Sequence, residues 1–204
     1  MTIEDKKKYF VIDIEKPLSF RSIFGNERSI IMEIGSGKGE FIAINSRFSP
    51  EQNFIGVELK SKRIVTTLKK LDIEKHKNVR LLNLFIDSNV SEIIPPASID
   101  EIIIYHPDPW PKKRHHKRRM LQQNFLDTLH TLLKEGGKIK ISTDNLDYAE
   151  WIKELFKERK DFVAMYKEGY TSIIPEDHFT TYFDKLQAEQ GFQPLFMMYK
   201  KSIN

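Results

Sequence analysis

Apolar runs typical of short strands alternate with helical patterns along most of this chain, from Ser29 to Glu158. Strands joined through helices pair in parallel, because the helical crossover returns the chain to the same end of the sheet. Helices then cover both faces of the sheet, so its strands are apolar throughout. The alternation therefore predicts an α/β fold with a mostly parallel sheet. Strands are expected at 29–34, 53–57, 78–84, 99–105 and 138–142, and helices at 38–47, 61–74, 118–134 and 146–158.

The two ends of the chain depart from this alternation. Residues 1–28 show little pattern and are predicted to form an N-terminal arm or a short lead-in helix. Residues 29–204 are predicted to form one domain, since 204 residues suit a single globular unit. Further strands are expected at 161–166 and 192–199, with a loop over 167–177. Because no helix separates these last strands, we expect them to pair antiparallel at an edge of the sheet.

The composition excludes several classes of protein. Apolar residues make up 40% and charged residues 30%, as in a folded soluble domain. No apolar run approaches the roughly 18 residues of a membrane span, and the lysines of "MTIEDKKKYF" lack the apolar core of a signal peptide. The chain has no cysteine, which excludes disulfides and thiolate metal sites and suits a reducing cytoplasm.

The positive charge of the chain is concentrated in one segment. The formal net charge is +4, yet the chain outside Lys112 to Arg119 holds 27 basic and 29 acidic residues. The basicity is therefore local. Such a patch indicates a polyanionic partner, although a run of charges also occurs on the solvated face of an ordinary helix.

Three glycines lie in "EIGSGKGE", residues 33–40, where the first strand meets the first helix. The spacing does not fit the phosphate loop G-x-x-x-x-G-K-[ST], because Lys38 is followed by Gly39. It also misses the dinucleotide pattern G-x-G-x-x-G, whose third glycine is replaced by Glu40. The turn does match the looser E-x-G-x-G-x-G pattern of enzymes that bind S-adenosylmethionine (SAM). A glycine turn without a ligand remains the alternative.

The acids near this turn suit a cationic nucleoside. SAM carries an ammonium and a sulfonium, so its site favours carboxylates over a phosphate cradle. Glu33, close to the end of the first strand, is a candidate for the ammonium. Glu58, at the end of the second strand, is a candidate for the ribose hydroxyls. An acid in that place serves the ribose of any nucleotide, so Glu58 alone does not separate SAM from NAD.

A second motif follows the fourth strand. Together with "EIGSGKGE" and "STDN", the stretch "PDPWPKKRHHKRR" (residues 107–119) resembles the bacterial tRNA (guanine-N7-)-methyltransferase family. The similarity runs from about Ile30 to the last strand. The glycine turn is shared with many SAM enzymes, whereas the D-P-W-x-K-x-R-H-x-K-R-R pattern is highly specific. The resemblance implies a Rossmann-like SAM-dependent fold and methyl transfer to N7 of a guanine in the variable loop of tRNA.

The resemblance also implies roles for individual residues. Asp108 is the expected catalytic acid, at the junction of the SAM and guanine pockets. The expected SAM contacts are Glu33, Gly35, Gly37, Glu58, Phe85 and Asp108. Lys112 and Asp144 are expected at the guanine. The expected RNA contacts are Arg114, His115, His116, Lys117, Arg118 and Arg119.

Two places depart from the family pattern. Near the adenine the family has an acid, but this chain has Phe85, with Asp87 two residues later. A late T-x-[FY]-E element of the family also helps to hold guanine. Here that element is "TTYFDKL", with phenylalanine in place of the glutamate and Asp184 beside it. Whether Asp184 replaces the glutamate stays open; the element supplies the substrate-binding candidates Thr180, Thr181, Tyr182 and Phe183.

The chemistry fits these residue types. Guanine N7 has a lone pair and no proton to lose, so methyl transfer needs no strong base and depends mainly on positioning. The product guanine is cationic, and a carboxylate beside it stabilises the developing charge. We therefore assign this role to Asp108. Asp144 is expected to accept hydrogen bonds from the N1–H and N2–H groups of the guanine. The alternative for Asp144 is a helix N-cap. Trp110 is expected to stiffen its loop, and no ligand spacing indicates a metal site.

Three rival functions remain at this stage. The departures at Phe85 and Phe183 also suit a non-catalytic RNA-binding module on a decayed methyltransferase fold. An NAD-dependent oxidoreductase lacks its third fingerprint glycine and leaves the basic segment unexplained. A SAM enzyme for small molecules ignores that segment as well. The expected partner is tRNA, with no membrane and no metal, and the oligomeric state is left open.

Overall fold

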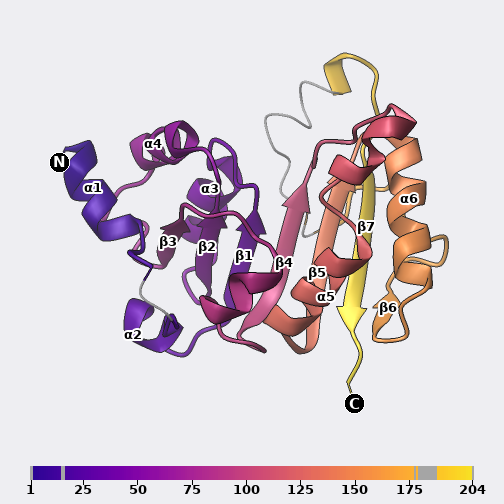
Figure 1. Ribbon diagram of the computed structural model, residues 1–204. Coiled ribbons are helices and arrows are strands. Elements are labelled where there is room, and N and C mark those ends of the chain that lie inside the picture. Colours follow the sequence, from indigo (N-terminus) through magenta and orange to yellow (C-terminus); the bar gives the residue numbers. More distant parts are fainter. Residues whose placement is uncertain (1, 15–16, 177, 179–187, 204) are drawn as a thin grey trace.

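A computed structural model describes residues 2–14, 17–176, 178 and 188–203 of the chain (Figure 1). Its centre is a seven-stranded sheet with the strand order β3-β2-β1-β4-β5-β7-β6. The five strands from β3 to β5 pair in parallel, whereas β7 is antiparallel to both β5 and β6. The predicted parallel sheet with an antiparallel C-terminal edge is therefore confirmed. The strands are β1 (Ile30–Ile34), β2 (Asn53–Val57), β3 (Val79–Leu82), β4 (Ile99–Tyr105), β5 (Leu133–Thr143), β6 (Phe162–Ala164) and β7 (Leu195–Lys201).

Helices cover both faces of the sheet, as predicted (Figure 1). One buried cluster joins the sheet to α1, α3 and α4, and a second joins the opposite face to α2, η1, α5 and α6. Successive strand residues contribute to the two clusters in turn: Ile31 packs with the first, and Ile30 and Met32 with the second. The helices are α1 (Ile3–Phe10), α2 (Phe20–Phe24), α3 (Glu40–Phe48), α4 (Ser61–Lys70), α5 (Gln123–Leu132), α6 (Leu146–Lys157) and the short 3-10 helices η1 (Ser88–Glu92) and η2 (Lys113–Arg118).

The N-terminal segment is packed against the rest of the molecule. Helix α1 begins with a capping box, in which Thr2 and Asp5 satisfy each other's backbone amides. It lies on α4, and the side chain of Phe10 at its end is completely buried. The ammonium of Lys6 donates to the Leu68 carbonyl, near the C-terminal end of α4. Part of the predicted arm therefore belongs to the hydrophobic core.

The helix expected over 118–134 starts later and ends earlier than its apolar pattern suggests. Residues 113–118 form η2, and α5 begins only at Gln123. The backbone of Leu121 is hydrogen-bonded to two side chains of α6. Its N–H donates to the Tyr148 hydroxyl, and its carbonyl accepts from the Trp151 indole. Because these contacts replace helical hydrogen bonds, the chain cannot coil into α5 until it has passed Leu121.

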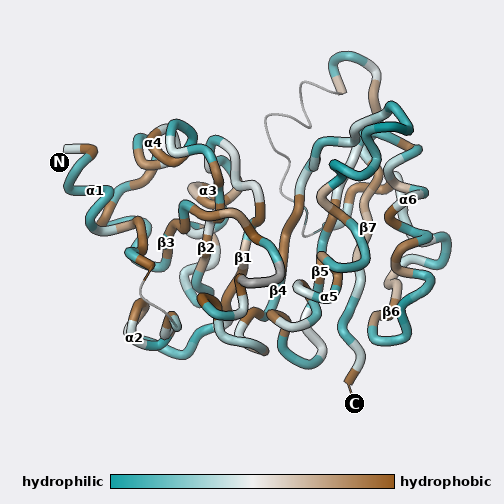
Figure 2. The backbone as a smooth tube through the Cα atoms, viewed as in Figure 1, coloured by the Kyte–Doolittle hydropathy of each residue, from teal (hydrophilic) through white to brown (hydrophobic). Residues whose placement is uncertain are grey.

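The β5 strand is longer than the 138–142 expected from its apolar core. It starts directly after α5, and Gly136 within it has a positive φ of 73°. No helix within the described residues has the length and apolar character that crossing a membrane requires. Figure 2 shows the core strands as the most apolar part of the backbone, in contrast to the hydrophilic segment that follows β4.

Candidate active site

Four acids lie at the carboxyl ends of neighbouring parallel strands. Glu33 is the penultimate residue of β1, and Glu58 follows β2 directly. Asp108 lies three residues beyond β4, and Asp144 comes directly after β5. Because β2, β1, β4 and β5 are consecutive in the sheet, all four acids meet at one edge. The strand order reverses between β1 and β4, and open α/β sheets bind ligands in the crevice at such a point.

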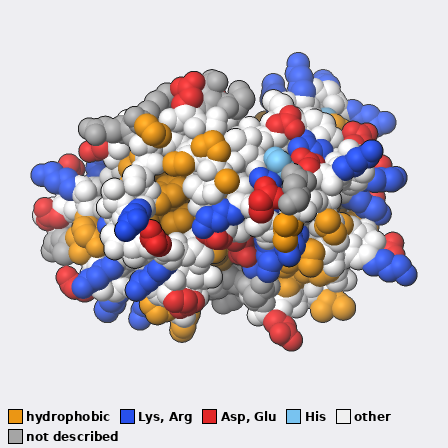
Figure 3. Space-filling model, turned by 90° about the horizontal axis from the view of Figure 1, so that it is seen from below, with side chains coloured by type: hydrophobic (Ala, Val, Ile, Leu, Met, Phe, Trp, Pro, Cys, Tyr) orange, Lys and Arg blue, Asp and Glu red, His pale blue; other side chains and the backbone are white. Residues whose placement is uncertain are grey.

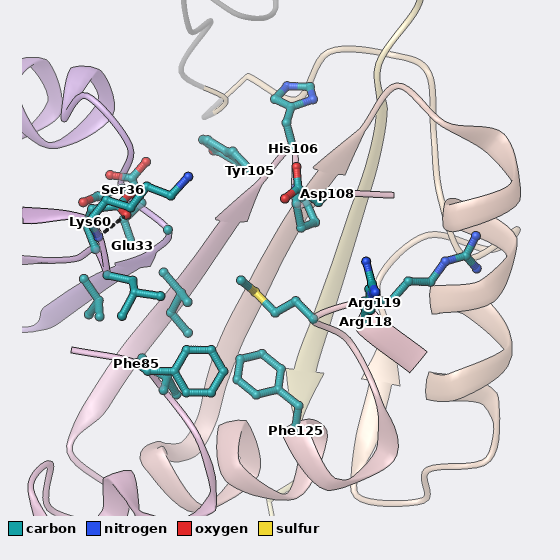
Figure 4. Close-up of a pocket in the computed structure, with 18 of the residues that line it drawn as sticks. Glu33, Ser36, Lys60, Phe85, Tyr105, His106, Asp108, Arg118, Arg119 and Phe125 are labelled. Carbon is teal, nitrogen blue, oxygen red and sulfur yellow. Dashed lines mark hydrogen bonds between the residues drawn. The ribbon is translucent and has the colours of Figure 1, made fainter. Parts of the chain in front are cut away.

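One large cavity occupies this crevice. Its volume is about 1250 Å³, and its wall includes Glu33, Gly35, Glu58, Asp108 and Asp144. Figure 4 shows Glu33 on one side of the cavity and Asp108 across from it, on the loop that leaves β4. The glycine turn, the two cofactor acids and the two acids expected at guanine thus share a single space.

The glycine turn leaves its backbone open to this space. Gly35 has a φ of 77° and Gly37 a φ of 55°, a region that side chains disfavour. A Cβ added to Gly35 meets nothing within 4 Å, so the turn exposes bare backbone to a ligand. Gly39 has a different task, because a Cβ there would lie 2.2 Å from the Thr67 side chain of α4. This third glycine lets α3 pack against α4.

Glu33 is the most unusual acid of the site. Its side chain is buried, and its Oε2 atom has no hydrogen-bond partner among the residues that the structure describes. Burial raises the pKa of this carboxyl well above its ordinary value, and the charges of Glu40 and Glu58 raise it further. A buried acid in this condition is stabilised by a cation placed beside it.

Glu58 is also buried, but its carboxylate is already held in place. Oε2 accepts from the Gly37 N–H at 3.0 Å, and Oε1 accepts from the Lys60 N–H at 2.8 Å. Arg63 lies 3.4 Å from the same Oε2. Among the described residues Oε1 accepts only the bond from Lys60 and retains a lone pair, so the fixed carboxylate is able to accept a further bond from a hydroxyl group.

These features fit SAM. An unpartnered buried carboxylate suits its ammonium, and the oriented acid at the end of β2 suits its ribose. A flat apolar surface suits its adenine: Phe85 is 65% exposed and Phe125 lies opposite it in the cavity wall (Figure 4). Asp87, the alternative contact for adenine, lines the same cavity.

The loop that carries Asp108 has an unusual backbone. His106 has a φ of 47° and Trp110 a φ of 43°, both rare for residues with a side chain. Between them lie Pro107, Asp108 and Pro109, so the acid is held on a short segment whose prolines fix their own φ angles. The Asp108 side chain is exposed to the cavity. Strain of this kind clusters at functional sites.

Asp144 is not the cap of α6, which was the alternative for this residue. Asn145 occupies the N-cap position, and its side-chain oxygen accepts from the Tyr148 N–H at 2.9 Å. The Asp144 carboxylate has no hydrogen bond to another described residue and lines the cavity. It is therefore available to a ligand.

The basic segment forms η2 at the mouth of the cavity. Lys113, Arg114, Lys117 and Arg118 are exposed, and Lys117 and Arg118 also line the cavity. Lys112, expected at the guanine, is exposed but lies outside the cavity wall, because the chain turns into η2 after Trp110. By contrast, acidic and basic side chains are interspersed on the end of the molecule seen in Figure 3.

Aromatic contacts hold the basic segment against its own loop. The Arg118 guanidinium lies 5.1 Å from the centre of the Trp110 ring, and the His115 ring packs edge-on against the same indole. The His116 ring packs edge-on against Trp151 of α6. Both histidines are half-buried, so η2 presents mainly its lysines and arginines to a partner.

Arg119 departs from the role expected of it. It was assigned to RNA, but its side chain has no exposed surface. Its guanidinium is bound to the Asp147 carboxylate and lies over the rings of Tyr148 and Trp151. A guanidinium enclosed in this way does not reach a phosphate on the surface. This burial is not readable from the sequence, because Arg119 ends a run of similar residues.

The remaining predicted residues, and two cavity residues that were not predicted, are considered next. Thr180, Thr181, Tyr182 and Phe183 lie outside the described residues, so the late guanine element stays a prediction. Phe125 and Lys60 line the cavity but were not foreseen, since Phe125 has the spacing of a core residue and Lys60 directly precedes a basic helix. No group of three or more His, Asp and Glu side chains within the described part of the chain has an arrangement that could hold a metal.

Comparison with solved structures identifies the fold. A 16S rRNA methyltransferase, KamB, superimposes with a TM-score of 0.66 over 90% of this chain and 93% of that one, at 12% identity. The 16S rRNA (adenine(1408)-N(1))-methyltransferase of Catenulisporales acidiphilia, solved with SAM, gives a TM-score of 0.54 over 100% and 92%, at 15% identity. The fold is thus the Rossmann-like fold of SAM-dependent methyltransferases.

Comparison of the sequence shows the family itself. Residues 27–192 match the family model described as "Putative methyltransferase". The tRNA (guanine-N(7)-)-methyltransferase of Nitrosococcus oceani is 35% identical over 92% of this chain and 78% of its own length. The enzyme of the same name from Bacillus subtilis is 35% identical over 72% and 70%. The resemblance found in the motifs is confirmed, and the chain belongs to the tRNA (guanine-N(7)-)-methyltransferase family.

Proposed function

We propose that the protein transfers a methyl group from SAM to N7 of a guanine in the variable loop of tRNA. One observation supports this most strongly. Asp108, from the family-specific motif, lines the same cavity as the glycine turn and the buried acids Glu33 and Glu58. Family membership supplies the reaction class, and the cavity supplies a place where donor and acceptor meet.

The chain's own residues would hold the methyl donor. Glu33 binds the ammonium, Glu58 accepts from the ribose hydroxyls, and Phe85 and Phe125 enclose the adenine. The backbone of Gly35 lines the cavity and permits close approach to the ligand, because a Cβ there would meet nothing within 4 Å. When bound, SAM supplies an electrophilic methyl group on a sulfonium.

The guanine is activated by position rather than by proton removal. The N7 lone pair forms the new bond to carbon, and the electron pair of the broken carbon–sulfur bond stays on sulfur. Positive charge therefore moves onto the purine. Asp108 stabilises this charge in the transition state, while Asp144 accepts from N1–H and N2–H and so aligns N7 with the methyl group.

The RNA is held by the exposed cations of η2. Lys113, Arg114, Lys117 and Arg118 contact phosphates, which gives affinity and salt dependence but no sequence information. Specificity then comes from the shape of the tRNA and from one base that leaves its stack to enter the cavity. No observation favours the non-catalytic RNA-binding alternative, and the cavity lined by Glu33, Glu58 and Asp108 supports the enzyme.

Mapping of the methylated nucleoside tests this proposal. The purified protein is incubated with methyl-labelled SAM and an unmodified tRNA transcript, and the product is digested to nucleosides. We expect the label in 7-methylguanosine from the variable loop. Label in another nucleoside, or none above the level of an Asp108→Asn control, would overturn the proposal.

A further inference from the structure

Arg119 belongs to the wall of the cavity, yet its side chain has no exposed surface. It is 2% exposed, and it is the last residue of the basic motif. Burying a guanidinium is costly unless its charge is paired and its N–H groups are bonded. Its partners therefore indicate what the molecule gains from this arrangement.

Those partners belong to two segments that bear the proposed guanine-binding acids. The Arg119 Nε donates to the Pro109 carbonyl at 2.8 Å, directly after Asp108. The guanidinium is bound to the carboxylate of Asp147, three residues after Asp144. Arg119 thus joins the loop of Asp108 to the first turn of α6.

Aromatic rings fix the plane of this link. The guanidinium carbon lies 5.0 Å from the ring centre of Tyr148 and 5.1 Å from that of Trp151, both on α6. A planar fork held against two rings has little freedom, so its bonds to Pro109 and Asp147 are directional. Lysine has neither the forked N–H donors of a guanidinium nor its planar shape.

The Asp108 loop needs such support. Its two ends, His106 and Trp110, have positive φ angles, a strained conformation that persists only where the surroundings enforce it. The bond from Arg119 falls on Pro109, between the acid and the second strained residue. The buried arginine is therefore placed to hold the loop in its strained form.

We propose that Arg119 is a positioning residue that sets the spacing between Asp108 and Asp144. This inference rests on the proposed function, because the two acids are assigned to the same guanine. It differs from an RNA contact in a testable way. A lysine at position 119 would keep the charge that a phosphate needs, but it would lose the fork that links the two segments.

Arg119→Lys and Arg119→Met test the proposal in kinetic terms. We expect kcat for methyl transfer to fall roughly 10- to 100-fold in both variants, since small displacements of reacting groups have effects of this size. The dissociation constants for SAM and for tRNA should change by less than about threefold, because neither ligand loses a direct contact. Full activity in Arg119→Lys, or a loss confined to tRNA affinity, would contradict the positioning role.

A matched control separates positioning from general stability. Arg159 is also a largely buried arginine, paired with Asp161 and Asp127 and placed over the Phe162 ring, but it is not part of the cavity wall. Arg159→Lys should lower thermal stability and leave kcat per folded molecule unchanged. Equal losses of kcat in the two lysine variants would show that Arg119 acts only through stability.

Hydrogen exchange tests the same inference without methyl transfer. We expect amides of residues 106–112 to exchange at least about tenfold faster in Arg119→Lys and Arg119→Met than in the wild-type protein. Faster exchange in a protein whose wild type methylates no tRNA would refute the proposed function and leave the link from Arg119 intact. Unchanged exchange would refute the link itself.

Discussion

The two sides of the cavity position their acids by opposite means. On the SAM side, Glu33 and Glu58 are buried, and backbone amides hold Glu58 in a fixed orientation. On the guanine side, Asp108 is exposed and Asp144 is half-buried, and neither accepts a hydrogen bond from another described residue. A small ligand enters the cavity completely, so the acids that bind it can be enclosed by the protein. A base carried by a large polyanion requires an open side.

The free-energy cost of holding the acids in position therefore differs between the two sides. On the SAM side, with Glu33 and Glu58, which we call the closed side, the cost appears in the raised pKa of Glu33. Burial keeps this carboxyl from ionising easily. On the guanine side, with Asp108 and Asp144, which we call the open side, the cost appears as strained backbone at His106 and Trp110. The buried Arg119 supports this backbone. Each side can therefore be broken separately, and the following predictions are ordered from the largest expected effect to the smallest.

Asp108→Asn should have the largest effect, and only on the open side. Removing the charge beside the developing purine cation is expected to lower kcat about 10²- to 10³-fold, the usual loss when one electrostatic contact in a transition state is removed. Single-turnover measurements at saturating tRNA give this rate directly. SAM affinity, measured by calorimetry, should fall far less than kcat, because asparagine keeps a side-chain oxygen for the SAM contact expected of Asp108. A large loss of SAM affinity would show that Asp108 belongs to the closed side.

Gly39→Ala should damage the closed side through packing. Its Cβ would lie 2.2 Å from Thr67 in a residue whose φ is 71°, so both a clash and backbone strain result. We expect the free energy of unfolding to fall by about 2–4 kcal/mol in urea titrations.

Gly25→Ala is the matched control for backbone strain. Gly25 has a φ of 68°, but a Cβ there meets nothing within 4 Å. Its cost should be only about 1 kcal/mol. Equal costs at the two glycines would mean that α4 moves aside without penalty and that the closed side is less rigid than described.

Glu33→Gln should weaken SAM binding about 10- to 100-fold, the range expected when a hydrogen bond between two charged groups becomes a neutral one. Calorimetry measures the loss. The variant without ligand should be more stable than wild type near pH 7, because it no longer buries an acid that resists ionisation. Lower stability of the variant at that pH would contradict the raised pKa of Glu33.

The pH dependence of the wild-type protein follows from the same raised pKa. Above the ordinary glutamate pKa the unfolded chain loses this proton while the folded protein keeps it, so the contribution of Glu33 to stability falls as the pH rises toward its folded pKa. An ammonium beside Glu33 favours the carboxylate. SAM affinity should therefore rise with pH over this range in wild type and stay flat in Glu33→Gln, as calorimetry in a series of buffers would show.

Replacing exposed cations of η2 should have the smallest effect per residue, and only on the open side. Lys113→Ala combined with Arg114→Ala is expected to lower the slope of log affinity for tRNA against log salt by about 0.7–0.9 per lost phosphate contact. Filter binding at several salt concentrations measures this slope. Lys7→Ala with Lys8→Ala on α1 is the control, and an equal change there would show that the binding is not localised to η2.

The closed side was largely predictable from the sequence. Apolar strands alternating with helices determine the parallel sheet, and the pattern E-x-G-x-G-x-G marks the first strand–helix junction, which lies at the cavity. Glu33 and Glu58 could be identified because a strand end is readable from where an apolar run stops. These inferences depend on local pattern, which a single sequence contains.

The open side was less predictable, because its arrangement depends on contacts between distant segments. Arg118 and Arg119 are adjacent, chemically identical and both part of the cavity wall, yet Arg118 is exposed and Arg119 is buried against α6. The start of α5 was placed too early for the same reason, since Tyr148 and Trp151 bind the backbone of Leu121. Nothing near these positions in the sequence reveals partners about 30 residues away.

The central claim is that the N7 lone pair of one guanine meets the methyl group in this cavity without prior loss of a proton. A tRNA in which that variable-loop guanine is replaced by 7-deazaguanine, which has a C–H group in place of N7, tests it directly. We expect this tRNA to bind with unchanged affinity and to accept no methyl group, while the unmodified transcript is methylated under the same conditions. Methylation of the 7-deazaguanine tRNA at the normal rate would show that another atom is the acceptor and would contradict the account.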